Sequence, residues 1–127
     1  MPSFGTLKAD TLTHSTAGSL ATNYVVEGSA KAWSNFDGDA STVSLRDSFN
    51  VSSITDNTTG DYTTNLTNSM SNADFSCNSF AGTGSVTAQS APQSLQGIAT
   101  GSIRTLTWSS SAFDRNYTMN QIFGDLA

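Results

Sequence analysis

The residue types that enzymes use most for nucleophilic and acid–base catalysis are scarce in this sequence. His14 is the only histidine and Cys77 the only cysteine. Serines are abundant, but no Gly-x-Ser-x-Gly elbow occurs, and a Ser-His-Asp triad would have to recruit His14. A single cysteine excludes an intrachain disulfide and a multi-cysteine zinc site, and we expect Cys77 to be a buried thiol. We therefore expect no catalytic residues, no cofactor and no enzymatic activity.

Two aspartates at alternate positions, Asp37 and Asp39, come nearest to a metal site, because alternating acidic oxygens suit a hard cation such as Ca²⁺. They do not continue into the spaced oxygen ligands of a calcium loop, and Asp37 followed by Gly38 is typical of a hairpin turn. Glycosidases need two carboxylates about 5 to 9 Å apart, and the spacing of the ten acidic residues indicates no such pair. We expect no bound metal.

The composition predicts the elements that must position any site. The chain has 127 residues, enough for one domain with a core, and only 36% of them are hydrophobic. Serine, threonine and asparagine together supply about 40%. Glutamate occurs once and lysine twice, so long helices lack their best formers, whereas β-branched and aromatic residues are frequent. This composition predicts an all-β fold.

Charge and hydropathy exclude two classes of partner. The net charge is −5, and the five basic residues are spread along the sequence instead of forming the stripe that a nucleic-acid site needs. No apolar run approaches the ~20 residues of a membrane-spanning helix. No basic region followed by an apolar segment marks the N-terminus as a signal peptide. We expect no nucleic-acid binding and no membrane insertion.

Alternation of apolar and polar residues predicts a series of short strands, the pattern of an antiparallel β-sandwich with a jelly-roll-like arrangement. In the first strand, Phe36 falls on one face and Trp33 on the other. The alternation breaks before Ile54, which predicts a bulge or corner near Ser52 and Ser53. The predicted strands cover residues 30–36, 43–48, 49–54, 61–66, 73–80, 82–88, 102–109 and 117–123.

The rest of the chain divides into an N-terminal arm, turns and one long loop. Residues 1–29 show no helical spacing and predict an extended arm or edge strand in front of the sandwich domain at residues 30–127. Residues 89–101 predict a long exposed loop. The residues that we expect in exposed loops and turns are Asp37, Gly38, Asp39, Asn57, Gly60, Gln89, Pro92, Gln93 and Gln96.

One stretch resembles a known module. Its residues are Ala30, Lys31, Ala32, Trp33, Asn35, Phe36 and Gly38, then residues 48–57 (Ser-Phe-Asn-Val-Ser-Ser-Ile-Thr-Asp-Asn), then Gly60, Asp61, Tyr62, Thr63 and Asn65. This pattern resembles a domain of tail-fibre and other virion appendage proteins of tailed bacteriophages, many of them marine or cyanobacterial. Asp39 and Ala40 stand where the family usually has a glycine, and Thr58 replaces another, which affects turn types. The motif residues expected in the core are Trp33, Phe36, Phe49, Ile54 and Tyr62.

The resemblance implies a function. It implies a phage virion structural protein, assembled in the host cytoplasm: a small tail-fibre, tip or adhesin subunit that forms a homotrimer, joins other virion proteins and contacts a host-surface glycan or protein. A capsid decoration or head-fibre protein is an alternative. A carbohydrate-binding or carbohydrate-active module is another alternative. Aromatic side chains could line a sugar-binding platform, although aromatics at alternating strand positions are more often core. The aromatics in question are Trp33, Phe36, Phe49, Tyr62, Phe75, Phe80, Trp108 and Phe123.

Overall fold

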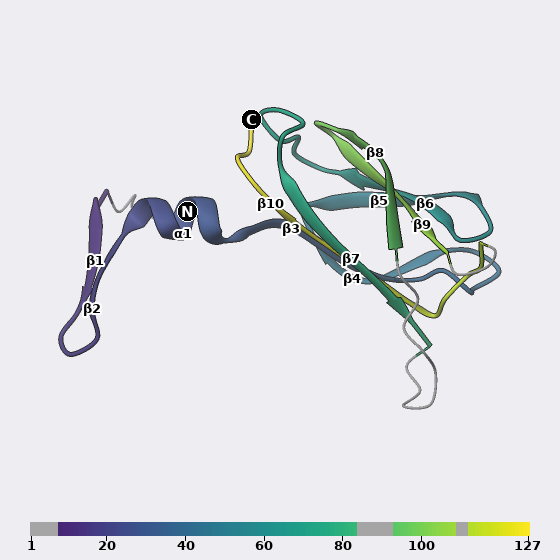
Figure 1. Cartoon of the computed structure of the whole chain (residues 1–127), viewed down its shortest axis with the longest axis horizontal. Helices are drawn as coiled ribbons and strands as arrows, with labels where there is room; N and C mark the ends of the chain where they lie inside the picture. The colour runs from purple at the N-terminus through teal and green to yellow at the C-terminus, as the bar shows by residue number, and fades with distance from the viewer. Residues whose placement is uncertain (1–7, 84–92, 109–111) are drawn as a thin grey trace, which may run out of the picture.

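A computed structural model describes residues 8–83, 93–108 and 112–127. Eight strands form two antiparallel four-stranded sheets that face each other (Figure 1). The first sheet has the order β4-β3-β10-β7 and the second the order β5-β6-β9-β8. This arrangement confirms the predicted all-β sandwich. The strands are β3 (Ala30–Asp37), β4 (Ser44–Phe49), β5 (Val51–Thr58), β6 (Asp61–Leu66), β7 (Ser76–Gly82), β8 (Gln93–Ala99), β9 (Ser102–Thr107) and β10 (Tyr117–Phe123).

Most strands lie where the alternation placed them. β6 and β10 have the predicted bounds, and β5 shifts its register against β6 between Val51 and Ser53, at the predicted bulge. The exposed loop expected at residues 89–101 is wrong in part, because β8 occupies Gln93–Ala99. β8 pairs with β9 and sets Ile98 opposite the buried Ile103. The predicted strand at residues 82–88 lies almost wholly outside the described residues.

The N-terminal segment contains regular structure that the sequence did not predict. β1 (Thr11–His14) and β2 (Gly18–Ala21) form a hairpin, and α1 (Thr22–Gly28) follows directly. The preference for an extended segment over a helix is therefore wrong for residues 22–28. Thr22 fixes the start of α1, since its backbone N–H donates to the carbonyl of Asp10 and its hydroxyl to the carbonyl of Ala9. A seven-residue helix is too short to establish a 3.6-residue period in the sequence.

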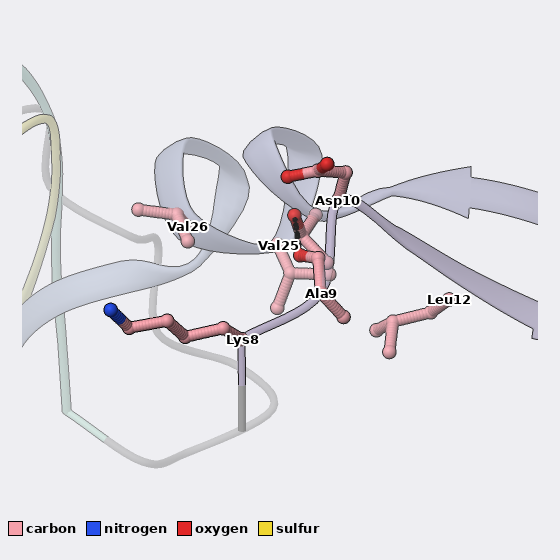
Figure 2. A pocket seen from close by; sticks show the side chains of 7 residues that line it. Lys8, Ala9, Asp10, Leu12, Val25 and Val26 are labelled. Carbon is pink, nitrogen blue, oxygen red and sulfur yellow. Dashed lines mark hydrogen bonds between the residues drawn. The ribbon is translucent and has the colours of Figure 1, made fainter. Parts of the chain in front are cut away.

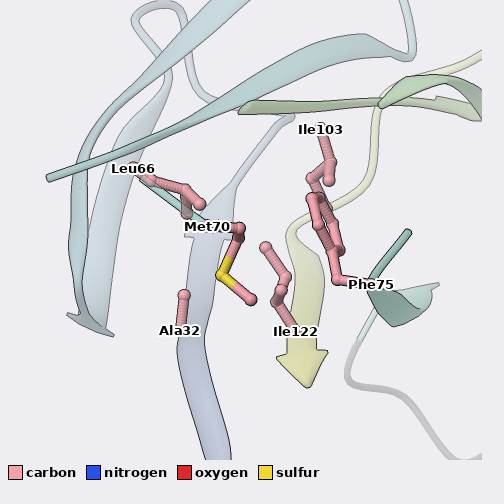
Figure 3. Close-up of a cluster of buried hydrophobic side chains, with 6 residues drawn as sticks. All are labelled: Ala32, Leu66, Met70, Phe75, Ile103 and Ile122. Atoms are coloured by element: carbon pink, nitrogen blue, oxygen red, sulfur yellow. The ribbon is translucent and has the colours of Figure 1, made fainter. Parts of the chain in front are cut away.

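The apolar core is a small cluster of buried side chains (Figure 3), most of which come from the ends of β3, β6, β9 and β10 that lie at one end of the sandwich. It joins side chains of both sheets with Met70 and Phe75 from the connection between β6 and β7. Toward the other end, Phe36 and Tyr62 are fully buried and meet edge to face, with ring centroids 5.2 Å apart. The core cluster consists of Ala32, Leu66, Met70, Phe75, Ile103 and Ile122.

Polar side chains fill much of the remaining space between the sheets. Asn120 of β10 donates from Nδ2 to the Thr64 hydroxyl of β6 over 2.8 Å, and its Oδ1 accepts from the Ser79 hydroxyl. This pair links the two sheets through a buried hydrogen bond, which a low dielectric strengthens. It also accounts for a sandwich with so small an apolar fraction. The buried polar residues between the strands are Ser34, Thr64, Thr105, Thr107, Thr118 and Asn120.

The chain crosses from the first sheet to the second at Asn50, between β4 and β5. Asn50 has φ +54°, and it is the only non-glycine residue with positive φ in the described part of the chain. Its Nδ2 donates to the carbonyls of Lys31 and Asn68, and its Oδ1 accepts from the Asn68 backbone N–H. Asparagine tolerates this left-handed conformation better than other residues with a side chain. Asn50 therefore fixes both the direction of the crossing and the loop after β6.

Substitutions at Asn50 test its two contributions separately. Asn50→Ala should lower the free energy of unfolding by about 2 to 4 kcal/mol, because it loses the hydrogen bonds and strains the backbone. Asn50→Gly relieves the strain and should be more stable than Asn50→Ala by about 1 kcal/mol. Urea unfolding of both variants measures the difference. Equal stability of the two variants would contradict a backbone role for Asn50.

Candidate functional site

The structure buries only two of the five expected core residues. Phe36 and Tyr62 are fully buried between the sheets. Trp33 and Ile54 are half-buried, and Phe49 is 53% exposed, so a core position is wrong for Phe49 and incomplete for the other two. The physical reason is the alternation itself: Trp33 and Phe36 have opposite parity in β3, and only the parity of Phe36 faces the second sheet.

The outward parity of the first sheet carries apolar side chains in a diagonal line across its four strands. Trp33 lies opposite Phe49 on β4, and Met119 lies opposite Phe80 on β7. Trp33 and Met119 belong to the neighbouring strands β3 and β10, one same-face position apart. Phe80 is 60% exposed, Phe49 53% and Met119 40%. We call Phe49, Trp33, Met119 and Phe80 the apolar stripe.

Polar side chains flank the stripe on both sides. Asn35 and Asp47 are opposite each other on β3 and β4, on one side of the stripe. Gln121 and Asn78 are opposite each other on β10 and β7, on the other side. The amides of Asn35, Gln121 and Asn78 make no side-chain hydrogen bond to any residue of the described chain, and the Oδ1 of Asn35 is shielded from solvent without a partner.

A hollow lies at the centre of this face. It has a volume of about 240 Å³, and its lining includes Trp33 and Met119 on one diagonal and Asn35 and Gln121 on the other. It is smaller than the roughly 300 to 1,000 Å³ of pockets that enclose drug-sized ligands. The hollow can therefore seat a single small ring at the surface, with apolar and amide groups alternating around it.

The cations at the border of this face are already paired. Arg46 donates from Nη2 to Asp37 Oδ2 over 2.6 Å and to the carbonyl of Asn116, and its guanidinium stacks on the Tyr117 ring. Lys31 donates from Nζ to the carbonyls of Val26 and Ser29. Asp47 accepts only the backbone N–H of Ser48 within the described residues. Of the two cations, Arg46 is neutralised by Asp37, and Lys31 has its donors on neutral carbonyls while Asp47 supplies a negative charge to the same face.

The outer face of the second sheet differs from the first in having its polar groups bonded to one another. Asn65 donates to the hydroxyls of Ser53 and Thr55. Arg104 forms a bidentate ion pair with Asp61, at 2.9 and 2.5 Å. The hydrogen bonds from the Arg104 side chain lower the pKa of Asp61, desolvation opposes them, and a hydrogen bond from Asn57 adds to the lowering. This face has few groups left for a ligand.

The turns near Gly38 and Gly60 form a closed end of the sandwich, which contradicts the expectation that both glycines are exposed. Both are buried. The Tyr62 hydroxyl lies 2.9 Å from the Gly38 carbonyl oxygen and 2.5 Å from Asp114 Oδ1, and Gly60 N–H donates to the same Asp114 oxygen. A Cβ on Gly38 would approach the Tyr62 hydroxyl to 2.6 Å. Burial, followed by the hydrogen bond to Asp114, raises the pKa of Tyr62, so this hydroxyl remains protonated.

The remaining predicted loop residues have mixed positions. Asp39 and Asn57 are exposed, as expected, and Asp37 is half-buried in β3 beside Arg46. Gln93 is half-buried and Gln96 exposed, both in β8 and not in a loop. Gln89 and Pro92 lie outside the described residues.

The structure also shows the surroundings of Cys77, which we expected to be buried, and of Asp37 and Asp39, the nearest approach to a metal site. Cys77 is half-buried and not fully buried, and desolvation raises the pKa of its thiol. Asp37 directs one oxygen to Arg46 and the other to the Asp39 backbone N–H. Residues 8–83, 93–108 and 112–127 contain no group of three or more side chains that could hold a metal ion. No helix in these ranges is long and apolar enough to cross a membrane.

The N-terminal unit (residues 8–29) forms a second candidate surface. Between the segment before β1 and helix α1 lies an open groove of about 510 Å³, lined by Leu12, Val25, Val26 and the stem of Lys8 (Figure 2). Helix α1 buries none of its residues, and Tyr24 and Val26 are 66% and 61% exposed. Apolar groups therefore face solvent on both the hairpin and the helix.

Comparison of the chain with protein-family models, with curated proteins and with solved structures finds no match in any of the three. The two candidate surfaces, the outer face of the first sheet and the N-terminal unit, are therefore the features that bear on function. Sequence analysis did not single out Met119 or the amides of Asn35, Asn78 and Gln121. Alternation along each strand could have found them, because Asn35 lies on the same face as Trp33, Asn78 on the same face as Phe80, and Gln121 on the same face as Met119.

The ion pair of Asp61 predicts a pH effect. Because the folded-state pKa of Asp61 lies below its ordinary value of 3.8, the pair stabilises the fold above about pH 4 and ceases to do so as the pH falls through the lowered pKa. Asp61→Asn should therefore destabilise the protein at pH 7 and progressively less at more acid pH. Urea midpoints across this range measure the effect, with Asp74→Asn as the exposed control. A constant deficit at all pH values would contradict the ion-pair contribution.

Proposed function

We propose that this chain is a non-enzymatic structural subunit of a phage virion: a small tail-fibre, tip or adhesin protein, assembled in the host cytoplasm. The resemblance of residues 30–65 to virion appendage domains supports the proposal, because these residues form the continuous hairpins β3–β4 and β5–β6. Asn50, at the crossing between the two hairpins, belongs to the resembling stretch.

The observation that carries the proposal is the N-terminal unit. In the part of the chain that the structure describes, its hairpin and helix stand clear of the sandwich and join it at the start of β3 (Figure 1). Helix α1 has seven residues and no buried side chain. An isolated helix shorter than about 12 residues and an isolated two-stranded hairpin are both marginal in water. A partner that covers Leu12, Tyr24 and Val26 would supply the missing burial, which is what an attachment segment requires.

Other copies of the chain are the partner that we propose. The resemblance to virion appendage proteins implies a homotrimer. The exposed apolar side chains of the N-terminal unit, Leu12, Tyr24 and Val26, are the groups that such copies would cover. We therefore propose a homotrimer joined through the N-terminal units.

A double variant in helix α1 tests the association. Tyr24→Asp with Val26→Asp places charges on two exposed side chains, so the sandwich should remain folded while the subunits separate. Light scattering at micromolar concentration should give three times the 13.3 kDa chain mass for the native protein and one chain for the variant. Asn23→Asp, exposed on the same helix, is the control and should remain trimeric. A monomeric native protein would contradict the trimer.

Deletion of residues 1–28 tests attachment to the particle. The deleted protein retains all eight strands and the core, so it should fold with a β-type circular dichroism spectrum. Phage particles made with it should lack the subunit, whereas particles with the full chain should carry it on the tail when labelled with antibody. Normal incorporation of the deleted protein would contradict attachment through the N-terminal unit. Antibody on the capsid instead of the tail would identify a head-fibre or decoration protein.

A further inference from the structure

We propose that the outer face of the first sheet binds a neutral oligosaccharide, laid along the apolar stripe of Phe49, Trp33, Met119 and Phe80. This inference deepens the proposed function, on which it rests only for the biological source of the glycan, the host surface.

The geometry of the stripe suits a chain of sugar rings. A pyranose ring has an apolar C–H face, which packs on aromatic side chains, and hydroxyl groups around its edge. The stripe crosses four strands, roughly 14 Å at about 4.8 Å per strand spacing. Asn35 and Asp47 flank it on one side, and Gln121 and Asn78 on the other. A bound chain could therefore stack on the rings while its hydroxyl edges reach one polar pair in each half of the stripe. Asn35 and Asp47 lie beside Trp33 and Phe49, and Gln121 and Asn78 lie beside Met119 and Phe80.

The free amides favour a ligand rich in hydroxyl groups over an apolar protein surface. Each primary amide has two N–H donors and an acceptor oxygen, and those of Asn35, Asn78 and Gln121 have no partner in the described chain. Covering them with an apolar surface would bury unpaired polar groups, which is costly. Protein interfaces commonly place an apolar centre inside a polar rim, whereas this face carries a narrow line with polar groups along its whole length.

The contrast with the second sheet strengthens this assignment. There, Asn65 and Asn57 are used up in hydrogen bonds to hydroxyls and to Asp61. That face shows how the same residue types satisfy one another when they only cover a sheet. On the first sheet the amides of Asn35, Asn78 and Gln121 make no such bonds within the described chain, although Gln121 and Asn78 lie opposite each other.

The charges select a neutral ligand. Arg46 is paired with Asp37, and the Lys31 ammonium, which has no carboxylate partner in the described chain, directs its donors to backbone carbonyls. Asp47 at the border adds a negative charge, and the whole chain carries −5. An anionic glycan would be repelled.

Fluorescence titration tests the proposal. Trp33 lies in the stripe, and a Trp108→Phe background leaves it as the only tryptophan. The probes are neutral hexasaccharides of glucose, mannose and N-acetylglucosamine, with hexagalacturonate as the anionic comparison. At least one neutral probe should give a saturable change in Trp33 emission, and hexagalacturonate should give none. No saturable change with any neutral probe at millimolar concentration, or binding of the anionic probe alone, would overturn the proposal.

Variants locate the site. Phe49→Ala and Phe80→Ala should each weaken binding about tenfold or more, the effect of losing one stacking partner. Both side chains are more than half exposed, so the fold should be unaffected. Gln121→Ala should weaken binding without altering the melting temperature. Matched controls are Leu95→Ala, an exposed apolar side chain in β8, and Asn65→Ala, an amide on the opposite face; both should bind as the parent does. Equal binding by Phe49→Ala and the parent would overturn the site.

Two further results separate this inference from the proposed function. The protein lacking residues 1–28 should bind the oligosaccharide with unchanged affinity for each site, even where it no longer joins the particle. The Phe49→Ala protein should still form trimers and join the particle. If Phe49→Ala instead dissociates the trimer, the stripe is a contact between copies of this chain, and the glycan proposal is wrong.

Discussion

The left-handed backbone conformation of Asn50, where the chain crosses between the sheets, is the constraint on which the arrangement of the outer face depends. Asn50 must turn the chain from β4 into β5 while its side chain holds Lys31 and the segment after β6. Because side chains alternate strictly along a strand, this turn also decides which parity of β4 faces outward. A shift of one residue would bury Phe49 and Asp47 and expose Ser48. The apolar stripe therefore depends on a backbone angle that few side chains tolerate.

The interior of the sandwich is polar as well as apolar. Asn120 and Thr64 connect the two sheets by a buried hydrogen bond. The apolar cluster around Ile103 and Ile122 lies toward one end, and Phe36 and Tyr62 pack edge to face toward the other. The low hydrophobic fraction of the chain therefore reflects the polar side chains between the sheets as well as the surface.

The sequence predicted the strands better than it predicted their surroundings. Alternation located β6 and β10 to the residue and the bulge in β5, because period and parity are local properties. It placed Trp33 and Phe36 on opposite faces, yet aromatic size suggested core for both. Which face is covered depends on sheet pairing, a non-local property. The burial of Gly38 and Gly60 could not be predicted because it too is non-local. Both glycines are covered by residues 113–115, which lie more than fifty positions later in the chain.

The closed end of the sandwich and the apolar stripe differ in how well they tolerate substitution. At the closed end, a Cβ added to Gly38 would collide with the Tyr62 ring, and a Cβ added to Gly60 would collide with the Phe113 backbone. Surface positions such as Phe49, Phe80 and Asn78 contact little, so changing them should cost within about 0.5 kcal/mol of stability. A rigid sheet can therefore carry different side chains along its stripe without altering the sandwich or the N-terminal unit. Recognition by such a face can change independently of folding and attachment, which suits a surface that must follow a changing ligand.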